Sequence, residues 1–181
     1  MAATALWALT GVAFAAPDFQ GRLADGTAST TCTKSGATKC AMFYNTTLNI
    51  TILNDWNIGT GFWSDTAAAG SAQDLAESAG VAQTGFTGWL LPTGDGAALA
   101  GPLNQYLSIW IDVGSSQAGL QAQFDGVPRP SPYSCWSGTV YAPHTEDAWL
   151  FSAFDAFQTP IFKISNDTPN ALYAWLCAPA M

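Results

Sequence analysis

Hydrophobic and polar residues alternate along three stretches of this chain. In residues 44–54, leucine and isoleucine alternate with asparagine and threonine, and the same period of two returns in residues 106–113 and 120–125. Successive side chains of a β-strand point to opposite faces of the sheet, so this alternation predicts strands with one buried face. The sequence Gly-Ser-Ser at residues 114–116 separates the last two stretches and predicts a hairpin turn between them.

Further strands are predicted downstream, where short apolar runs are separated by turns rich in glycine and proline. They lie at residues 134–141, 148–155, 160–165 and 171–177. Three prolines between residues 126 and 132 exclude a central strand there, because proline cannot donate to the hydrogen-bond ladder. Residues 17–41 are rich in small and polar residues and predict an irregular arm or an opening strand.

One stretch predicts a helix. Residues 66–82 are dominated by alanine, and Ser71 followed by Asp74 resembles a capping box, in which a serine hydroxyl accepts a hydrogen bond from the first helical turn. Gly80 is placed to end this helix. Taken together, these elements are typical of an all-β fold, and we expect an antiparallel β-sandwich or barrel of about 7–9 short strands with one short helix.

The N-terminal residues form a short apolar run that ends in Ala-Phe-Ala at residues 13–15. This pattern is typical of a secretory signal peptide cleaved before Ala16, although no lysine or arginine precedes the apolar run. A buried N-terminal strand or helix is the alternative, since spanning a bilayer takes about 20 residues. We therefore expect residues 1–15 to be a signal peptide and residues 16–181 to be a single secreted, extracellular domain.

The composition supports a folded domain and excludes some partners. Hydrophobic residues make up 49% of the chain and charged residues only 10%, against about 25% charged residues in an average protein. The formal net charge is −8, which repels the phosphates of nucleic acids and of anionic lipids. We therefore expect no nucleic-acid partner, and no motif in the sequence indicates a cofactor.

The chain has four cysteines, which can pair in three ways. They are Cys32, Cys40, Cys135 and Cys177. We favour Cys32–Cys40, which closes a small loop, and Cys135–Cys177, which ties the C-terminal region to the middle of the chain. A zinc site is the alternative, but the chain has a single histidine and no closely spaced cysteine pair, so we expect disulfides and no metal.

Three asparagines lie in N-glycosylation acceptor sequences, namely Asn45, Asn49 and Asn166. Asn45 and Asn49 are four residues apart on one predicted strand, so we expect both to project from the same solvent-facing side. Asn166 is a weaker candidate because Pro169 follows its acceptor sequence. We expect at least one of these sites to carry a glycan.

The chain has eight tryptophans, and three of them stand out by their polar neighbours. Most tryptophans are expected in the core, because large aromatic side chains dominate cores. Trp56, Trp63 and Trp110 depart from this rule, because polar residues surround them in the sequence. With Asp55 and Asn57 they form the predicted ligand-binding set, since indole rings beside hydrogen-bonding groups suit a sugar, an apolar ligand or a protein contact.

Catalytic chemistry has weaker support. His144 is the only histidine and stands beside Glu146 and Asp147, but consecutive polar residues after a proline more often form a solvated loop. Asp155 lies in an apolar stretch, where burial would raise its pKa and make it a general acid, and Asp112 lies on the polar face of the predicted hairpin. Asp155, His144 and Asp112 are therefore weak catalytic candidates.

Three hypotheses for function follow from these features. The first is a secreted, disulfide-bonded glycoprotein that binds a glycan or a small apolar molecule through surface or pocket tryptophans. The second is a secreted enzyme, either a hydrolase with paired carboxylates or a cyclase or isomerase with an aromatic pocket. The third is a membrane-active or cell-surface protein, for which a neutral membrane suits the negative charge better than an anionic one. Binding without catalysis is favoured, because the sequence has no motif such as Gly-x-Ser-x-Gly.

Overall fold

The computed structural model describes residues 19–96, 100–127, 134–163 and 174–175. Within these residues the chain forms eight strands and three helices. The strands are β1 (Phe19–Arg22), β2 (Met42–Asn45), β3 (Ile50–Leu53), β4 (Thr60–Gly61), β5 (Ser134–Val140), β6 (Asp147–Ser152), β7 (Gln158–Phe162) and β8 (Ala174–Trp175). The helices are α1 (Ala72–Thr84), α2 (Gln105–Asp112) and α3 (Gln117–Gln123). The fold is β-rich, as the sequence predicts, but it has three helices where one was expected.

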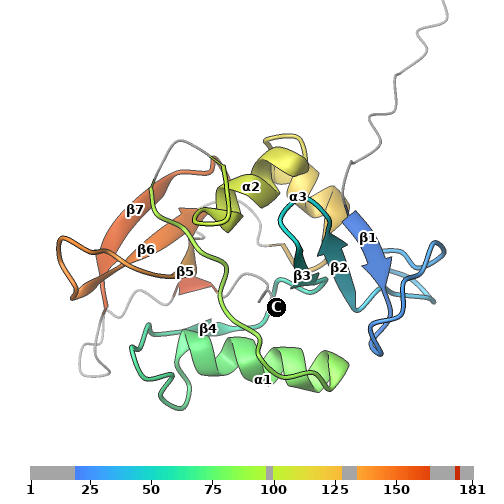
Figure 1. Cartoon of the computed structure of the whole chain (residues 1–181), viewed down its shortest axis with the longest axis horizontal. Helices are drawn as coiled ribbons and strands as arrows, with labels where there is room; N and C mark the ends of the chain where they lie inside the picture. Colours follow the sequence, from blue (N-terminus) through green and yellow to red (C-terminus); the bar gives the residue numbers. More distant parts are fainter. Residues whose placement is uncertain (1–18, 97–99, 128–133, 164–173, 176–181) are drawn as a thin grey trace, which may run out of the picture.

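The strands form two sheets that have no strand in common. One sheet consists of β1, β2 and β3 in antiparallel order, and the other has the order β4-β8-β5-β6-β7. The pairs of the second sheet are antiparallel except β5 with β8, which is parallel. Figure 1 shows the three-stranded sheet on the right and β5, β6 and β7 on the left, with α2 and α3 between them at the top and α1 along the bottom. A sandwich or a barrel stays a prediction, because these pairings alone define neither.

The second alternating stretch, predicted as a strand, forms α2. Asn104 is its N-cap, and the side-chain oxygen accepts a hydrogen bond from the backbone N–H of Leu107 (3.3 Å). Tyr106, Ile109 and Trp110 have the helical spacing of three and four residues and are buried. The strand prediction is wrong because so many positions here are apolar that alternation and helical periodicity fit the sequence equally well.

The third alternating stretch forms α3, so the predicted hairpin is wrong as well. Ser116, expected in the hairpin turn, is the N-cap of α3, and its hydroxyl accepts a hydrogen bond from the N–H of Gly119 (3.0 Å). Leu120 is the buried residue of this helix. A Cβ on Gly119 would lie 2.0 Å from the carbonyl oxygen of Val113, so glycine lets α3 pack closely against the residue that caps α2.

Helix α1 agrees with the sequence except at its end. Ser71 is its N-cap and accepts a hydrogen bond from the N–H of Asp74 (3.3 Å), as the capping box predicts. Gly80 does not end the helix; it is buried, and an added Cβ would come within 2.1 Å of the Trp89 ring. The helix is instead capped by Gly85, whose φ of 77° is a left-handed conformation that glycine adopts without strain.

Residues 44–54 form parts of two strands, β2 and β3, rather than one. The chain turns at residues 46–49, where Asn49 has a φ of 55°, a left-handed conformation that asparagine tolerates. Because of this turn, Asn45 and Asn49 do not share a solvent-facing side. Asn45 is buried (0% exposed) and Asn49 is exposed. The third acceptor, Asn166, lies outside the described residues.

Two clusters of buried side chains form the core. The large cluster takes its residues mainly from β2, β3, α2, α3, β5 and β6, and the small cluster takes them mainly from α1, β5 and β6. The large cluster consists of Cys40, Met42, Phe43, Ile52, Leu53, Trp56, Trp89, Tyr106, Ile109, Trp110, Leu120, Phe124, Val127, Cys135, Phe151 and Ala153. The small cluster consists of Trp63, Ala72, Ala76, Leu91, Trp136, Ala148 and Leu150.

The predicted Cys32–Cys40 disulfide is present, within the segment that connects β1 to β2. Cys135 is fully buried and is also disulfide-bonded, while its predicted partner Cys177 lies outside the described residues. The predicted signal peptide, residues 1–15, lies outside them too. Among the described residues, no helix has the length and the hydropathy needed to cross a membrane. The disulfides are consistent with an extracellular protein.

Candidate functional site

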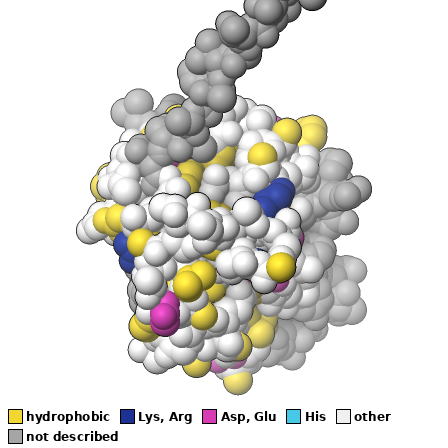
Figure 2. Space-filling model, turned by 90° about the vertical axis from the view of Figure 1, so that its right-hand side faces the viewer, with side chains coloured by type: hydrophobic (Ala, Val, Ile, Leu, Met, Phe, Trp, Pro, Cys, Tyr) yellow, Lys and Arg dark blue, Asp and Glu magenta, His cyan; other side chains and the backbone are white. Residues whose placement is uncertain are grey.

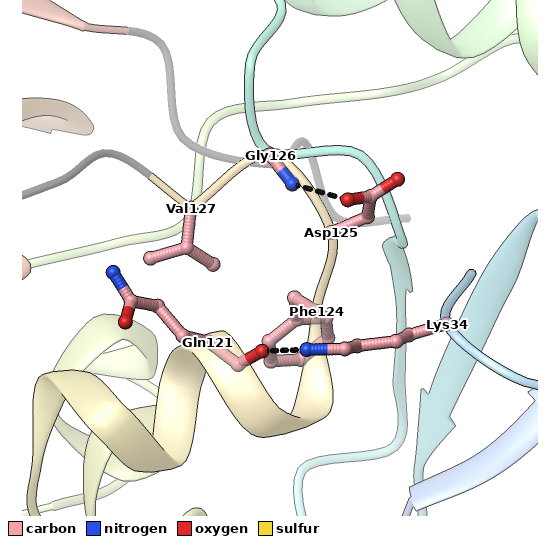
Figure 3. A pocket seen from close by; sticks show the side chains of 6 residues that line it. All are labelled: Lys34, Gln121, Phe124, Asp125, Gly126 and Val127. Carbon is pink, nitrogen blue, oxygen red and sulfur yellow. Dashed lines mark hydrogen bonds between the residues drawn. The ribbon is translucent and has the colours of Figure 1, made fainter.

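A cleft of about 330 Å³ opens between the disulfide loop and the end of α3 (Figure 3). The disulfide loop, residues 32–40, contributes one lining side chain, and the end of α3 with the residues after it contributes the others. The lining residues are Lys34, Gln121, Phe124, Asp125, Gly126 and Val127. The cleft is therefore built from segments that are far apart in the sequence.

A buried asparagine holds the two walls of the cleft together. The side chain of Asn54, which directly follows β3, is completely buried (0% exposed). Its Nδ2 donates hydrogen bonds to the carbonyl oxygens of Lys34 (2.7 Å) and Cys40 (2.8 Å) in the disulfide loop. Its Oδ1 accepts a hydrogen bond from the backbone N–H of Asp125 (3.1 Å) on the other wall. Because the Asn54 side chain is buried and its amide is hydrogen-bonded to both walls, it fixes the distance between them.

Lys34 crosses the cleft from the disulfide loop to α3. Figure 3 shows its side chain reaching the last turn of the helix, where Nζ donates a hydrogen bond to the carbonyl oxygen of Gln121. The last carbonyl groups of a helix have no partner within the helix and carry partial negative charge, so a lysine ammonium is favourable there. The side-chain amide of Gln121 also lines the cleft, with both a donor and an acceptor.

Asp125 supplies a carboxylate at the rim of the cleft. Its Oδ2 forms an ion pair with Nζ of Lys39 (2.7 Å), and its Oδ1 accepts a hydrogen bond from the N–H of Gly126 (2.9 Å). The hydrogen bond from Lys39 holds the pKa of Asp125 below its usual range, and the charge of Lys34 acts in the same direction. Asp125 is therefore ionised at neutral pH and is a hydrogen-bond acceptor.

Two residues of the predicted ligand-binding set, Asp55 and Asn57, lie directly behind the cleft. Oδ1 of Asp55 accepts a hydrogen bond from the N–H of Asn57 (2.9 Å). An added Cβ on Gly126 would lie 2.3 Å from that same Oδ1, and Gly126 has a φ of 64°. The close approach and the left-handed backbone both require glycine at this position. Asp55 and Asn57 therefore support the cleft wall but do not line it.

The three tryptophans of the predicted ligand-binding set are all buried in the core clusters, contrary to the expectation that they depart from core packing, and their role in ligand binding stays a prediction. Trp56 is 1% exposed, and Trp63 and Trp110 are each 7% exposed. Their polar sequence neighbours did not indicate exposure, because adjacent side chains on irregular or helical backbone point in different directions. Only Trp56 is near the cleft, with its ring 4.8 Å from that of the lining residue Phe124.

The buried tryptophans differ in how their indole N–H groups are satisfied. Nε1 of Trp63 donates a hydrogen bond to the carbonyl oxygen of Ser137 (2.8 Å). The ring of Trp110 packs edge-on against the ring of Phe151, with the ring centroids 6.3 Å apart. Nε1 of Trp56 is buried and has no hydrogen-bond partner in the described part of the chain. Most buried polar groups in proteins are hydrogen-bonded, so Trp56 is an exception located beside the cleft.

The weak catalytic candidates are not brought together. The His144 side chain is 62% exposed, and its Nδ1 lies 3.6 Å from Oε1 of the exposed Glu146. Asp155 is exposed, contrary to the burial expected from its apolar neighbours, and Oδ1 accepts a hydrogen bond from the N–H of Phe157 (3.1 Å). These two residues lie beyond opposite ends of β6, and a six-residue strand spans about 20 Å. They cannot act on one bond.

Asp112, the third catalytic candidate, lies in α2 rather than on a hairpin. Its Oδ2 accepts a hydrogen bond from Nδ2 of Asn45 (2.7 Å), and it lines a second hollow of about 190 Å³ together with Thr47, Leu48 and Ser108. This hollow is smaller than the roughly 300 Å³ at which small-molecule sites begin. Asp112 is therefore a structural acceptor that links α2 to β2.

Sequence reasoning missed the residues that line the cleft. The alternation in residues 120–125 assigned Gln121 and Asp125 to a strand, and so hid their place at the end of a helix. One signal was available: two of the chain's five basic residues, Lys34 and Lys39, lie inside the short disulfide loop. A rigid, positively charged loop can form one wall of a polar binding site.

Among the described residues, no group of three or more histidine, cysteine, aspartate or glutamate side chains is arranged to hold a metal ion. Comparison with models of protein families, with curated proteins and with solved structures gives no match to this chain.

Proposed function

We propose that this protein is an exported binding module that holds a short, uncharged glycan in the cleft between the disulfide loop and the end of α3. The observation that carries the proposal is the set of hydrogen-bonding side chains around one hollow of about 330 Å³. Small-molecule sites start at about 300 Å³, so the cleft has room for a small ligand rather than a long chain.

The lining groups match the hydroxyl groups of a sugar. Each hydroxyl both donates and accepts hydrogen bonds, and the cleft offers both kinds of partner. The carboxylate of Asp125 accepts, the side-chain amide of Gln121 does both, and the ammonium of Lys34 has more protons than the single hydrogen bond to Gln121 uses. A polyhydroxylated ligand can therefore pair with every polar side chain that lines the cleft.

The balance of charge favours an uncharged ligand. Two cations, Lys34 and Lys39, and two anions, Asp55 and Asp125, surround the cleft. Phosphate or carboxylate sites concentrate positive charge, and cation sites concentrate negative charge, but neither sign is in excess among the described residues around the cleft. The face of the molecule in Figure 2 likewise carries few and separate charged side chains.

A small apolar ligand, the other class that the sequence left open, has less support. The apolar lining residues Phe124 and Val127 are only 1% and 8% exposed, so a ligand would cover little additional apolar surface. The tryptophans take a different role from the one the sequence predicts. Trp56 supports Phe124 from behind and does not contact the ligand.

Export is the second part of the proposal. It is supported by the signal-like residues 1–15 and by the disulfide-bonded state of Cys32, Cys40 and Cys135, since disulfides persist outside the reducing cytosol. Export would also bring the acceptor asparagines to the N-glycosylation machinery of a eukaryotic secretory pathway. The test is whether the full chain, expressed in a eukaryotic host, is released into the medium without residues 1–15.

Glycan binding is tested by titrating the protein with neutral mono- and disaccharides while recording amide NMR spectra. We expect shifts at residues 121–127 and at Lys34. Gln121→Ala should weaken binding about fivefold, the effect of losing a hydrogen bond of about 1 kcal/mol. Gln123→Ala is the matched control, because it changes the same residue type on the same helix outside the cleft lining. Equal binding by both variants would overturn the proposal, as would the absence of shifts at millimolar sugar.

A second candidate function, contact with a neutral membrane surface, is favoured by one turn. Phe154 and Phe157, in the turn between β6 and β7, are 56% and 63% exposed. Aromatic side chains at a loop tip are suited to the interface of a zwitterionic bilayer, but the exposed Asp155 between them opposes insertion. Flotation with phosphatidylcholine vesicles tests this function, and equal flotation of the wild type and a Phe154→Ser/Phe157→Ser variant would exclude the turn.

A further inference from the structure

The β2–β3 hairpin places two glycosylation acceptors in opposite environments. Asn45 is the last residue of β2 and has no exposed surface (0%). Its amide is used at both ends: Nδ2 donates a hydrogen bond to Oδ2 of Asp112 (2.7 Å), and Oδ1 accepts one from the N–H of Leu48 (2.9 Å). Asn45 thereby ties the hairpin turn to α2.

A glycan on Asn45 is incompatible with this arrangement. N-linked glycans are attached through Nδ2, so the first sugar would occupy the space next to that nitrogen. In the folded protein Oδ2 of Asp112 occupies the position next to that nitrogen, 2.7 Å away, and Asn45 has no exposed surface. A chain modified at Asn45 would have to give up the contact between β2 and α2.

Asn49 has the opposite properties. It is exposed at the end of the hairpin turn, and its φ of 55° is a conformation that asparagine adopts more readily than most residues. Its Oδ1 accepts a hydrogen bond from the hydroxyl of Tyr44 (2.6 Å). That bond fixes the amide through its oxygen, which leaves Nδ2 for the glycan.

Both acceptor asparagines are available for glycosylation only before the chain folds. The acceptor sequence of Asn49 includes Thr51, which is 7% exposed in β3, so the folded hairpin does not present the whole acceptor sequence. Modification must therefore precede formation of the hairpin. At that stage Asn45 and Asn49 are equally accessible, and folding then selects between the products.

We propose that the folded, exported protein carries an N-linked glycan on Asn49 and that Asn45 is unmodified in every folded molecule. The inference rests on the export part of the proposed function and is independent of what the cleft binds. It assigns Asn49 as a modification site and excludes modification at Asn45.

The test is glycopeptide mapping of the full chain from a eukaryotic secretory host, with medium and cell fractions analysed separately. Deglycosylation in ¹⁸O-water marks each formerly occupied asparagine. Chymotrypsin, which cleaves after Tyr44 and Leu48, puts the two asparagines on different peptides. We expect the label on Asn49 in the secreted protein and none on Asn45, with any Asn45-modified chains confined to the cell fraction.

Two variants sharpen the result. Asn49→Asp keeps the acceptor oxygen for Tyr44 and removes the glycosylation site, and the secreted variant should carry no glycan on Asn45 although that acceptor sequence is intact. Thr47→Ala removes the acceptor sequence of Asn45 and is the matched control, which should keep the glycan on Asn49. Label on Asn45 in secreted wild type or secreted Asn49→Asp would overturn the inference, and so would an unmodified Asn49 in secreted wild type.

A second experiment tests the glycosylation inference independently of export by residues 1–15. If residues 1–15 do not direct secretion, the same chain behind a heterologous signal peptide still enters the secretory pathway. Label on Asn49 alone in that material would mean that export by this chain's own N-terminus fails while the glycosylation inference holds. Label on Asn45 in folded material from the heterologous signal peptide would overturn the glycosylation inference regardless of export.

Discussion

The small and the large cluster of the core both bury tryptophans, but they hold them by different interactions. In the small cluster, Nε1 of Trp63 donates to the carbonyl oxygen of Ser137 (2.8 Å) in β5, and Nε1 of Trp136 in β5 donates to that of Gly61 (2.9 Å) in β4. The two indoles thus join strands that are not neighbours in the sheet. In the large cluster, Nε1 of Trp89 donates to the carbonyl oxygen of Phe86 (3.0 Å), but Nε1 of the equally buried Trp56 has no hydrogen-bond partner among the described residues.

This difference shows which interactions fix the position of the tryptophans in each cluster. Paired indole N–H groups are directional, so they fix the position of β4 relative to β5. Trp56 is located instead by its backbone N–H, which donates to the carbonyl oxygen of Asp125 (3.0 Å), and by ring contact with Phe124. An unpaired buried donor costs about 1–3 kcal/mol, and it occurs in the wall behind the candidate cleft. The wall behind the cleft therefore contains a buried donor that the structure leaves unpaired within the described residues.

The largest expected effect comes from breaking the paired indoles. Trp136→Phe removes the donor to the carbonyl oxygen of Gly61 and leaves a cavity in the small cluster. We expect a loss of about 2–4 kcal/mol in the free energy of unfolding, from the unpaired acceptor and the lost packing. Urea denaturation measures it, with Trp149→Phe at a half-buried position as control. A loss no larger than in the control would mean that the indole hydrogen bonds do not stabilise the small cluster.

A substitution in α1 tests the contact between that helix and the large cluster. Gly80→Ala places a Cβ within 2.1 Å of the Trp89 ring, which is itself 1% exposed and has no room to move. Overpacking costs about 1–3 kcal/mol, and alanine recovers up to about 1 kcal/mol in helix propensity, so we expect a net loss of about 1–2 kcal/mol. Ser78→Ala, exposed on the same helix, should change the free energy of unfolding by only a few tenths of a kcal/mol. A Gly80→Ala variant as stable as wild type would contradict the close approach.

The counterpart in the large cluster should be nearly neutral. Trp56→Phe removes an indole N–H that makes no hydrogen bond, so the relief of an unpaired buried donor offsets part of the lost packing. We expect a change of about 1 kcal/mol or less in the free energy of unfolding, clearly below that of Trp136→Phe. If the two substitutions cost the same under identical denaturation conditions, the distinction between the clusters is lost.

The smallest effect concerns the pH dependence of the cleft. The hydrogen bond from Lys39 lowers the folded-state pKa of Asp125, so its stabilising contribution is complete above the unfolded pKa of about 3.9 and disappears as the pH falls through the lower, folded value. Lys39→Gln should raise the pKa of Asp125 toward its ordinary value in an NMR titration. Both side chains are 41% exposed, so we expect at most about 1 kcal/mol at pH 7.

The control for that titration is Lys163→Gln, because Lys163 pairs with Asp65 (2.8 Å) and not with Asp125. This variant should leave the pKa of Asp125 unchanged. A pKa of Asp125 that does not respond to Lys39→Gln would contradict the ion pair at the rim of the cleft.

Some features could be read from the sequence because they depend on neighbouring residues only. The capping pair Ser71 and Asp74 placed the start of α1, and the short spacing of Cys32 and Cys40 indicated their disulfide. The strands β5, β6, β7 and β8 lie within or next to the runs predicted between glycine and proline turns. The cap and the disulfide join residues close in the chain, and the strand runs are bounded by local turn residues, so a local pattern carries the information.

Other features were decided by contacts between distant segments. The alternation of apolar and polar residues did not distinguish α2 and α3 from strands. In α2, the packing of Tyr106 and Trp110 against Phe151 of β6 decides which face is buried. Asn45 and Asn49 look alike as acceptor sequences, and only the contact of Asn45 with α2 separates them.

The sequence by itself determined a β-rich, disulfide-bonded, acidic chain, the start of α1 at Ser71 and the Cys32–Cys40 loop, since these depend on residue type and short spacing. Only the tertiary structure decided which polar residues meet. The cleft joins Lys34, Asn54 and Asp125 through hydrogen bonds between segments twenty and seventy-one residues apart. No periodicity in a single stretch records such a contact, because it forms only when buried packing brings those segments together.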